Sequence, residues 1–119
     1  ALMLMISSQT GAAPIEIGDV YFCNMKDNVG IRDTNDWKVR NFNPKNFKFQ
    51  VTESEIIFSG DSFFGEMTAS KTFHSHNLLE ARRTASILTL DATKKTTRFV
   101  YATVAFAEGH FITATCDKF

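Results

Sequence analysis

Two cysteines, Cys23 and Cys116, are the residues whose type and spacing most directly predict chemistry in this chain. They are the only cysteines among 119 residues. Each follows a run that favours a β-strand, at residues 20–22 and 112–115. A cysteine pair near the two ends of a small domain is typical of a disulfide formed in an oxidising compartment. The sequence therefore predicts a Cys23–Cys116 disulfide, with two unpaired buried thiols of a cytosolic protein as the alternative.

His74 and His76 are a candidate metal site. Residues two apart on a strand point to the same face of a sheet, so both imidazoles are able to reach one zinc or copper ion. Such a site needs a third ligand, for which the sequence offers His110, Glu66, Glu80 or Glu108. The alternative is that both histidines are exposed or hydrogen-bonded near a strand end. The sequence indicates no other cofactor.

Aromatic residues are the third group with a predicted role. The chain has twelve phenylalanines, one tryptophan and two tyrosines, and alternating strand positions place most of the rings in the core. Phe63 and Phe64 are consecutive, so they cannot both face one core from a strand. We predict that they and Trp37 contact a ligand or partner. The alternatives are that the segment of Phe63 and Phe64 folds back over one end of the domain and that Trp37 caps the core. The phenylalanines predicted to lie in the core are Phe47, Phe49, Phe58, Phe99 and Phe106.

Several classes of chemistry lack their signatures in this sequence. It has no Gly-x-Ser-x-Gly motif, no Cys-x-x-Cys motif and no glycine-rich phosphate loop. Thirteen basic and thirteen acidic residues balance, whereas a nucleic-acid-binding protein normally carries a basic surface. The sequence therefore favours a protein that is not an enzyme and that does not bind nucleic acid.

The N-terminus resembles the end of an export signal. Residues 1–6 are apolar and residues 7–13 are mostly small, with cleavage after Ala12 or after Ala13 as the two options. We therefore interpret residues 1–13 as a signal-peptide remnant or a disordered N-terminus, and residues 14–119 as one domain. The alternative is a first strand or a helix start at residues 2–6. No apolar run approaches the roughly 20 residues of a membrane span. Because of the signal-like N-terminus and the cysteine pair, we expect a periplasmic or secreted protein.

The rest of the chain predicts short strands. Residues 47–52 alternate between apolar and polar types, with Phe47, Phe49 and Val51 on one face. Residues 27–36 are rich in turn formers and predict a loop with at most a short strand, and Glu108-Gly109 predicts a turn. Residues 78–90 favour one long strand, with a short helix as the rival. Further strands are expected at 19–25, 37–42, 56–58, 71–76, 97–107 and 110–116.

These elements predict an all-β fold with little helix: a small antiparallel meander of seven or eight strands that forms a barrel or a two-sheet sandwich. No motif ties the chain to a named family. The leading functional hypothesis is an exported binding module for an apolar small molecule or another extracytoplasmic protein. The alternatives are a structural or assembly subunit and a metal-binding protein using His74 and His76. The sequence does not predict the oligomeric state.

Overall fold

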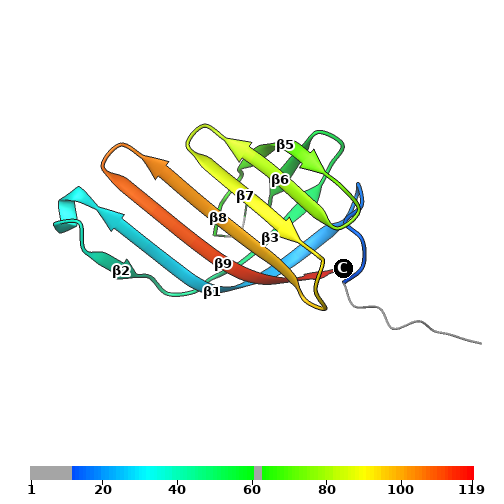
Figure 1. The fold of residues 1–119 in the computed structure, drawn as a ribbon, viewed down its shortest axis with the longest axis horizontal. Coiled ribbons are helices and arrows are strands. Elements are labelled where there is room, and N and C mark those ends of the chain that lie inside the picture. The colour runs from blue at the N-terminus through cyan, green and yellow to red at the C-terminus, as the bar shows by residue number, and fades with distance from the viewer. Residues whose placement is uncertain (1–11, 61–62) are drawn as a thin grey trace, which may run out of the picture.

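The chain forms a single antiparallel β-sheet that closes into a barrel (Figure 1). The computed structural model describes residues 12–60 and 63–119. Eight strands form the closed barrel, and β2 is an extra strand beside one end of β1. The all-β prediction is confirmed, and the barrel is the correct one of the two predicted architectures. The elements are β1 (Val20–Arg32), the 3₁₀ turn η1 (Asp33–Asn35), β2 (Val39–Asn41), β3 (Asn46–Val51), β4 (Glu55–Phe58), β5 (Thr68–His74), β6 (Leu78–Arg83), β7 (Ser86–Asp91), β8 (Thr97–Ala105) and β9 (Glu108–Lys118).

Strands β3 to β9 follow one another as an antiparallel meander, in which each strand pairs with the next. β1 closes the barrel because it pairs with β3 on one side and with β9 on the other. The predicted alternation in β3 is confirmed, since Phe47, Phe49 and Val51 are buried and the residues between them are not. Closure gives the barrel strands hydrogen-bonded neighbours on both sides, which removes the exposed edges of an open sheet.

The disulfide between Cys23 and Cys116 is confirmed. The two residues are direct partners in the ladder between β1 and β9, so the bond joins the two strands that close the barrel. Both cysteines are buried. The bond therefore supports barrel closure from inside the core.

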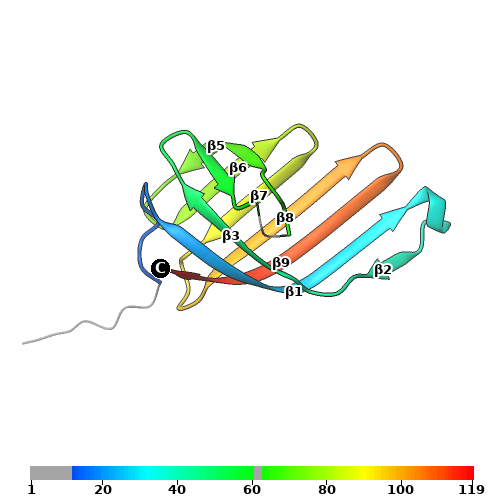
Figure 2. The same ribbon diagram turned by 180° about the vertical axis from the view of Figure 1, so that it is seen from behind.

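β1 is longer than the sequence predicted. The register with β9 shifts between Met25 and Asp27, and the strand then continues to Arg32 instead of giving way to a loop. Beyond the shift, β1 pairs with β2 in place of β3. This half of β1, together with β2 and the halves of β8 and β9 that meet at their turn, extends past the end of the barrel (Figures 1 and 2). We call this extension the protruding sheet.

Local contacts explain why turn-forming residues remain within β1. The side chain of Asn28 is buried, and its Nδ2 donates a hydrogen bond to the carbonyl of Asn43 at 3.2 Å. The ring of Phe42 lies over Gly30, where a β-carbon would come within 2.9 Å of it. A larger residue at position 30 would displace the ring. The sequence shows Asn and Gly but does not show these contacts, which come from a segment more than ten residues away.

The prediction of one long strand over residues 78–90 is wrong. The segment forms a hairpin, in which β6 and β7 are joined by a turn at Thr84 and Ala85. Leu79 on β6 and Leu88 on β7 both face the core. An odd-numbered and an even-numbered residue of one regular strand point to opposite faces, so burying both requires a break in the alternation, which here is the turn between β6 and β7.

The turn between β8 and β9 lies at Phe106 and Ala107, not at the predicted Glu108-Gly109. Ala107 has a φ of 63°, a conformation that the sequence interpretation assigned to glycine. Phe106 is fully exposed, so its predicted place in the core is wrong. A residue in a two-residue turn has no opposite sheet face to pack against. The other four phenylalanines predicted to lie in the core are buried.

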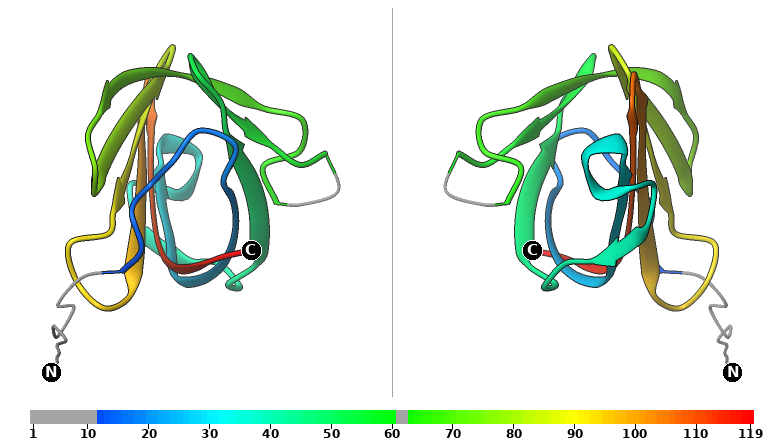
Figure 3. Two further views of the ribbon diagram at one scale, coloured as in Figure 1. Left: turned by 90° about the vertical axis from the view of Figure 1, so that its right-hand side faces the viewer. Right: turned by 90° about the vertical axis from the view of Figure 1, so that its left-hand side faces the viewer.

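Aromatic rings fill the barrel, and two side chains close its ends. The centroids of the Phe47 and Phe99 rings are 4.7 Å apart, and Phe64 packs against this cluster from the loop before β5. At the opposite end, the N-terminal segment crosses the barrel (Figure 3). There Ile15 is buried, and its N–H donates to the carbonyl of His76 at 2.9 Å. Residues 1–11, which carry most of the predicted signal remnant, lie outside the described residues.

Candidate interaction surface

The histidine pair occupies the end of β5 and the loop after it. His74 Nδ1 lies 2.9 Å from Lys71 Nζ, and His74 Nε2 lies 2.8 Å from the carbonyl oxygen of Ile15. His76 is exposed. Within residues 12–60 and 63–119, no group of three His, Cys, Asp or Glu side chains is placed to hold a metal ion. In this structure His74 holds the N-terminal segment to the barrel, and the metal site remains a prediction from the sequence.

The three aromatic residues predicted as contacts do not form one site. Phe64 is part-buried against the core, and Phe63 packs edge-on against it with a centroid distance of 5.0 Å and remains 40% exposed. The predicted alternative of a loop folded over the barrel end therefore describes this segment. Trp37 lies elsewhere, between η1 and β2 at the tip of the protruding sheet, with a φ of 58° and 59% exposure. Trp37 and the loop that carries Phe63 and Phe64 therefore lie in different parts of the molecule.

The outer face of the protruding sheet and of the adjoining end of β7 carries two adjacent rows of uncharged, mostly apolar residues. The strand register places the members of each row side by side across the sheet. All of them point away from the barrel interior, because they alternate with inward-facing residues. We call these two rows the apolar face. The first row is Ile87, Ala102, Phe111 and Val29, and the second is Val104, Gly109, Ile31 and Val39.

The apolar face is substantially exposed. Val104 is 80% exposed, Val39 60% and Phe111 46%. Single exposed hydrophobic residues are ordinary on protein surfaces, but contiguous rows of them mark interaction sites. Phe106 and Trp37 at the tip add further exposed apolar area next to these rows.

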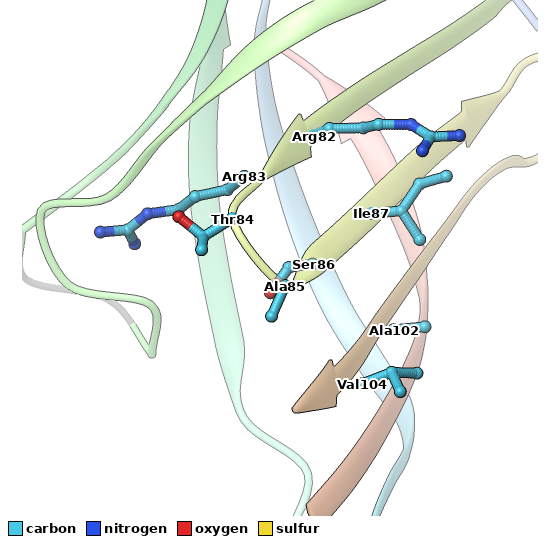
Figure 4. Close-up of a pocket in the computed structure, with 8 residues that line it drawn as sticks. All are labelled: Arg82, Arg83, Thr84, Ala85, Ser86, Ile87, Ala102 and Val104. Carbon is cyan, nitrogen blue, oxygen red and sulfur yellow. The ribbon is translucent and has the colours of Figure 1, made fainter. Parts of the chain in front are cut away.

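A hollow of about 410 Å³ adjoins the apolar face where β8 passes the turn between β6 and β7 (Figure 4). Arg82 points to the same side of the sheet as Ile87 and Val104, whereas Arg83 points to the other side (Figure 4). Arg82 Nε lies 3.4 Å from Glu80 Oε2, and its side chain is 61% exposed. The hollow therefore places apolar side chains beside the solvent-accessible guanidinium of Arg82.

The inner face of the same strands is polar. Ser86 Oγ lies 3.0 Å from the Tyr101 hydroxyl and 2.8 Å from Thr103 Oγ1. His110 Nε2 lies 2.5 Å from Asn28 Oδ1. At the protruding sheet the usual arrangement is thus inverted, with hydrogen-bonded groups on the inner side and apolar groups facing water.

His110 has a depressed pKa. Burial is the main cause, because it disfavours the charged imidazolium, and the positive charge of Arg32 acts in the same direction. Glu108 opposes both. The neutral ring is favoured in the folded protein, where it lies beside Phe42 with centroids 5.7 Å apart.

The interior of the barrel is occupied by side chains. Phe47, Phe49, Phe58 and Phe99 are each at most 2% exposed, and their rings contact one another. A hollow lined by Met67, Ala81 and Tyr101 on the inner side is too small to hold a water molecule. The structure therefore directs attention to the outer surface.

No family model, no curated protein and no solved structure matches this chain. In the part of the chain that the structure describes, no helix is long and apolar enough to cross a membrane.

The sequence interpretation missed the apolar face, although the signal was present. The strand predicted at residues 97–107 has a second apolar side at residues 100, 102, 104 and 106, which favours a central strand or a strand inside a barrel or sandwich. Val29 and Ile31 alternate in the same way, but they lie in the segment 27–36 that predicts a loop with at most a short strand. Strand pairing places the two sets on one surface, and that pairing is not evident from either segment alone.

Proposed function

We propose that this protein is an exported binding module that docks another extracytoplasmic protein through the apolar face. The observation that carries the proposal is the exposure of two register-matched rows of apolar side chains on a sheet whose inner side is polar. An unpartnered surface of this kind is unfavourable in water and is stabilised when a partner covers it.

A protein partner suits this surface better than an apolar small molecule. Small-molecule sites are usually concave and enclose most of the ligand. Here the aromatic core fills the barrel, and the apolar face lies on the outside of strands. The adjoining hollow with Arg82 at its rim would accept an acidic side chain of the partner, because the guanidinium is accessible.

Export is part of the proposal and is supported by the disulfide. A buried bond between the strands that close the barrel is stable where thiols are oxidised and is at risk in a reducing cytosol. A protein outside the cytoplasm also meets surface and secreted proteins as its potential partners.

Site-specific photocrosslinking tests the proposal. A photoreactive phenylalanine analogue would replace Val104 on the apolar face or, as the matched control, Ile57, which is 39% exposed on β4 and lies outside the face. We expect a protein adduct from the extracytoplasmic fraction of the source cells at position 104 and none at position 57. The adduct would be identified by mass spectrometry and its protein purified. Binding of that protein should be lost with Val104→Asp and retained with Ile57→Asp. Equal adducts at both positions would contradict the proposal.

A further inference from the structure

We propose that a second copy of this chain binds the apolar face as a two-fold symmetric dimer, in which Phe111 of each copy lies over Gly109 of the other. This inference rests on the proposed function, because it names a partner for the same face. Its central feature is the projecting ring of Phe111 and the depression at Gly109, which lie two residues apart on β9.

The depression is at Gly109. A β-carbon added there would have one neighbour within 4 Å, the backbone oxygen of Thr103 at 3.8 Å, so the protomer leaves this space open. The projection is Phe111, which points to the same side of β9 and is 46% exposed. Gly30 differs from Gly109, because the space of its missing side chain is already taken by Phe42 at 2.9 Å.

β8 continues the match of a large residue with a small one, and β1 places two apolar residues opposite each other. On β8 the first row has Ala102 and the second row has Val104, and on β1 the corresponding residues are Val29 and Ile31. Consider a two-fold axis that lies in the plane of the face, runs between the two rows and crosses β9 at the level of residue 110. Rotation about this axis would lay the first row of one copy over the second row of the other. Ala102 would then face Val104, and Phe111 would face Gly109.

Each of these two central pairs joins a large side chain to a small one, which is how well-packed layers interdigitate. An isologous interface requires this property, because the same patch must be complementary to itself. Most apolar surfaces lack it. The self-matching of the two rows is the reason to infer a second copy ahead of an unrelated protein.

Charge does not oppose the dimer. The eight residues of the apolar face include no charged side chain. The chain has thirteen basic and thirteen acidic residues, so two copies carry no net charge with which to repel each other. A net charge near zero favours association.

Sedimentation velocity of the full chain with its disulfide intact tests the dimer. For the wild type, we expect the weight-average mass to rise roughly twofold, from monomer towards dimer, over about a hundredfold range of protein concentration. Gly109→Val would fill the depression and leave no room for Phe111 of the other copy. The variant should remain monomeric across the same range.

Two controls make the result specific. Gly109→Val adds apolar area and a residue type that favours strands, and the protomer has space for it, so at concentrations where the wild type is monomeric its melting temperature should not fall below that of the wild type. Thr115→Val places the same apolar residue type on the same strand but outside both rows, and this variant should still form dimers. If Gly109→Val is the only variant that fails to dimerise, the cause is the filled depression at residue 109 and not unfolding.

The remaining outcomes each overturn the inference. A wild type that stays monomeric at every concentration excludes the dimer, and a specific protein adduct at position 104 would then leave the proposed function standing. A Gly109→Val variant that dimerises like the wild type excludes the contact between Phe111 and Gly109. If neither a dimer nor an adduct is found, the proposed function fails together with the inference.

Discussion

Cys23 and Cys116 face each other as partners across β1 and β9, so one covalent bond fixes the strand pair in which the first strand of the barrel meets the last. Strands β3 to β9 are joined by short connections, but β1 and β9 are held together through hydrogen bonds, packing and this bond. The disulfide therefore acts where the chain itself provides no connection.

Removing the disulfide should lower the free energy of unfolding by about 4–5 kcal/mol, because the bond closes a loop with a sequence separation of 93 residues and restricts the unfolded chain. The measurement is urea denaturation of the Cys23→Ala/Cys116→Ala double variant beside the wild type. Adding a reductant should destabilise the wild type and leave the double variant unchanged. A difference below about 1 kcal/mol would show that the bond contributes little to closure.

The Tyr21 hydroxyl predicts an unusual stabilising substitution. It is buried and finds no hydrogen-bond partner among the described residues, and its pKa is raised mainly by burial. Tyr21→Phe keeps the ring that stacks on Phe49 at 5.4 Å and removes the unsatisfied group, so we expect a gain of about 1 kcal/mol.

Tyr101→Phe is the matched control for Tyr21→Phe. Its hydroxyl lies within 3.0 Å of Ser86 Oγ and accepts a hydrogen bond from Thr103, so its removal should cost about 1 kcal/mol. Both variants would be compared with the wild type by thermal and chemical denaturation. A loss of stability with Tyr21→Phe would indicate that its hydroxyl has a partner, such as a bound water.

Phe63 and Phe64 should respond very differently to truncation. Phe64 packs against Phe58 at 4.5 Å and Phe47 at 4.9 Å, so Phe64→Ala removes a ring from the barrel end and should cost about 3 kcal/mol. Phe63 has one ring contact, to Phe64, and should cost less than about 1 kcal/mol. Equal losses in chemical denaturation would mean that the loop does not close the barrel as described.

His110 gives the protein a predicted sensitivity to acid. The folded state holds its pKa below the ordinary value of 6.5, so the unfolded chain takes up the proton first as the pH falls. The stability from this group is thus present above about pH 6.5 and is lost as the pH falls below it. Urea denaturation at about pH 7.5 and about pH 5 should show a smaller decrease for His110→Asn than for the wild type. Equal decreases would exclude His110 as the cause.

The sequence was informative wherever a strand is amphipathic in the ordinary way. Phe47 to Val51 could be predicted because alternation, turn residues and burial all agree there. The two cysteines could be paired because both lie in strand-like runs near the ends of the domain. These features are local or rest on a single pair of residues, so the sequence alone defines them.

The errors share a physical cause, which is pairing between distant segments. Asn28 is a residue type that favours loops, but the carbonyl of Asn43 accepts its hydrogen bond and stabilises it within β1. Val104 and Phe106 are apolar residues of the kind that usually lie in a core. Both are exposed, because β8 and the turn after it extend past the end of the barrel. The missed hairpin at residues 78–90 is an exception with a local cause, because Thr84-Ala85 lacks the usual turn-forming residues although the opposite parity of Leu79 and Leu88 indicated a break in the strand.

The pairing of β1 with β9 also determines when this protein is able to fold. Tyr21 has its ladder partner at Lys118, so the barrel cannot close until β9 has left the ribosome. Folding during synthesis can then produce only the meander of neighbouring hairpins, with its two outer strands unmatched. During that interval the nascent chain is vulnerable to association with other chains, and a chaperone would be of most use before β9 emerges.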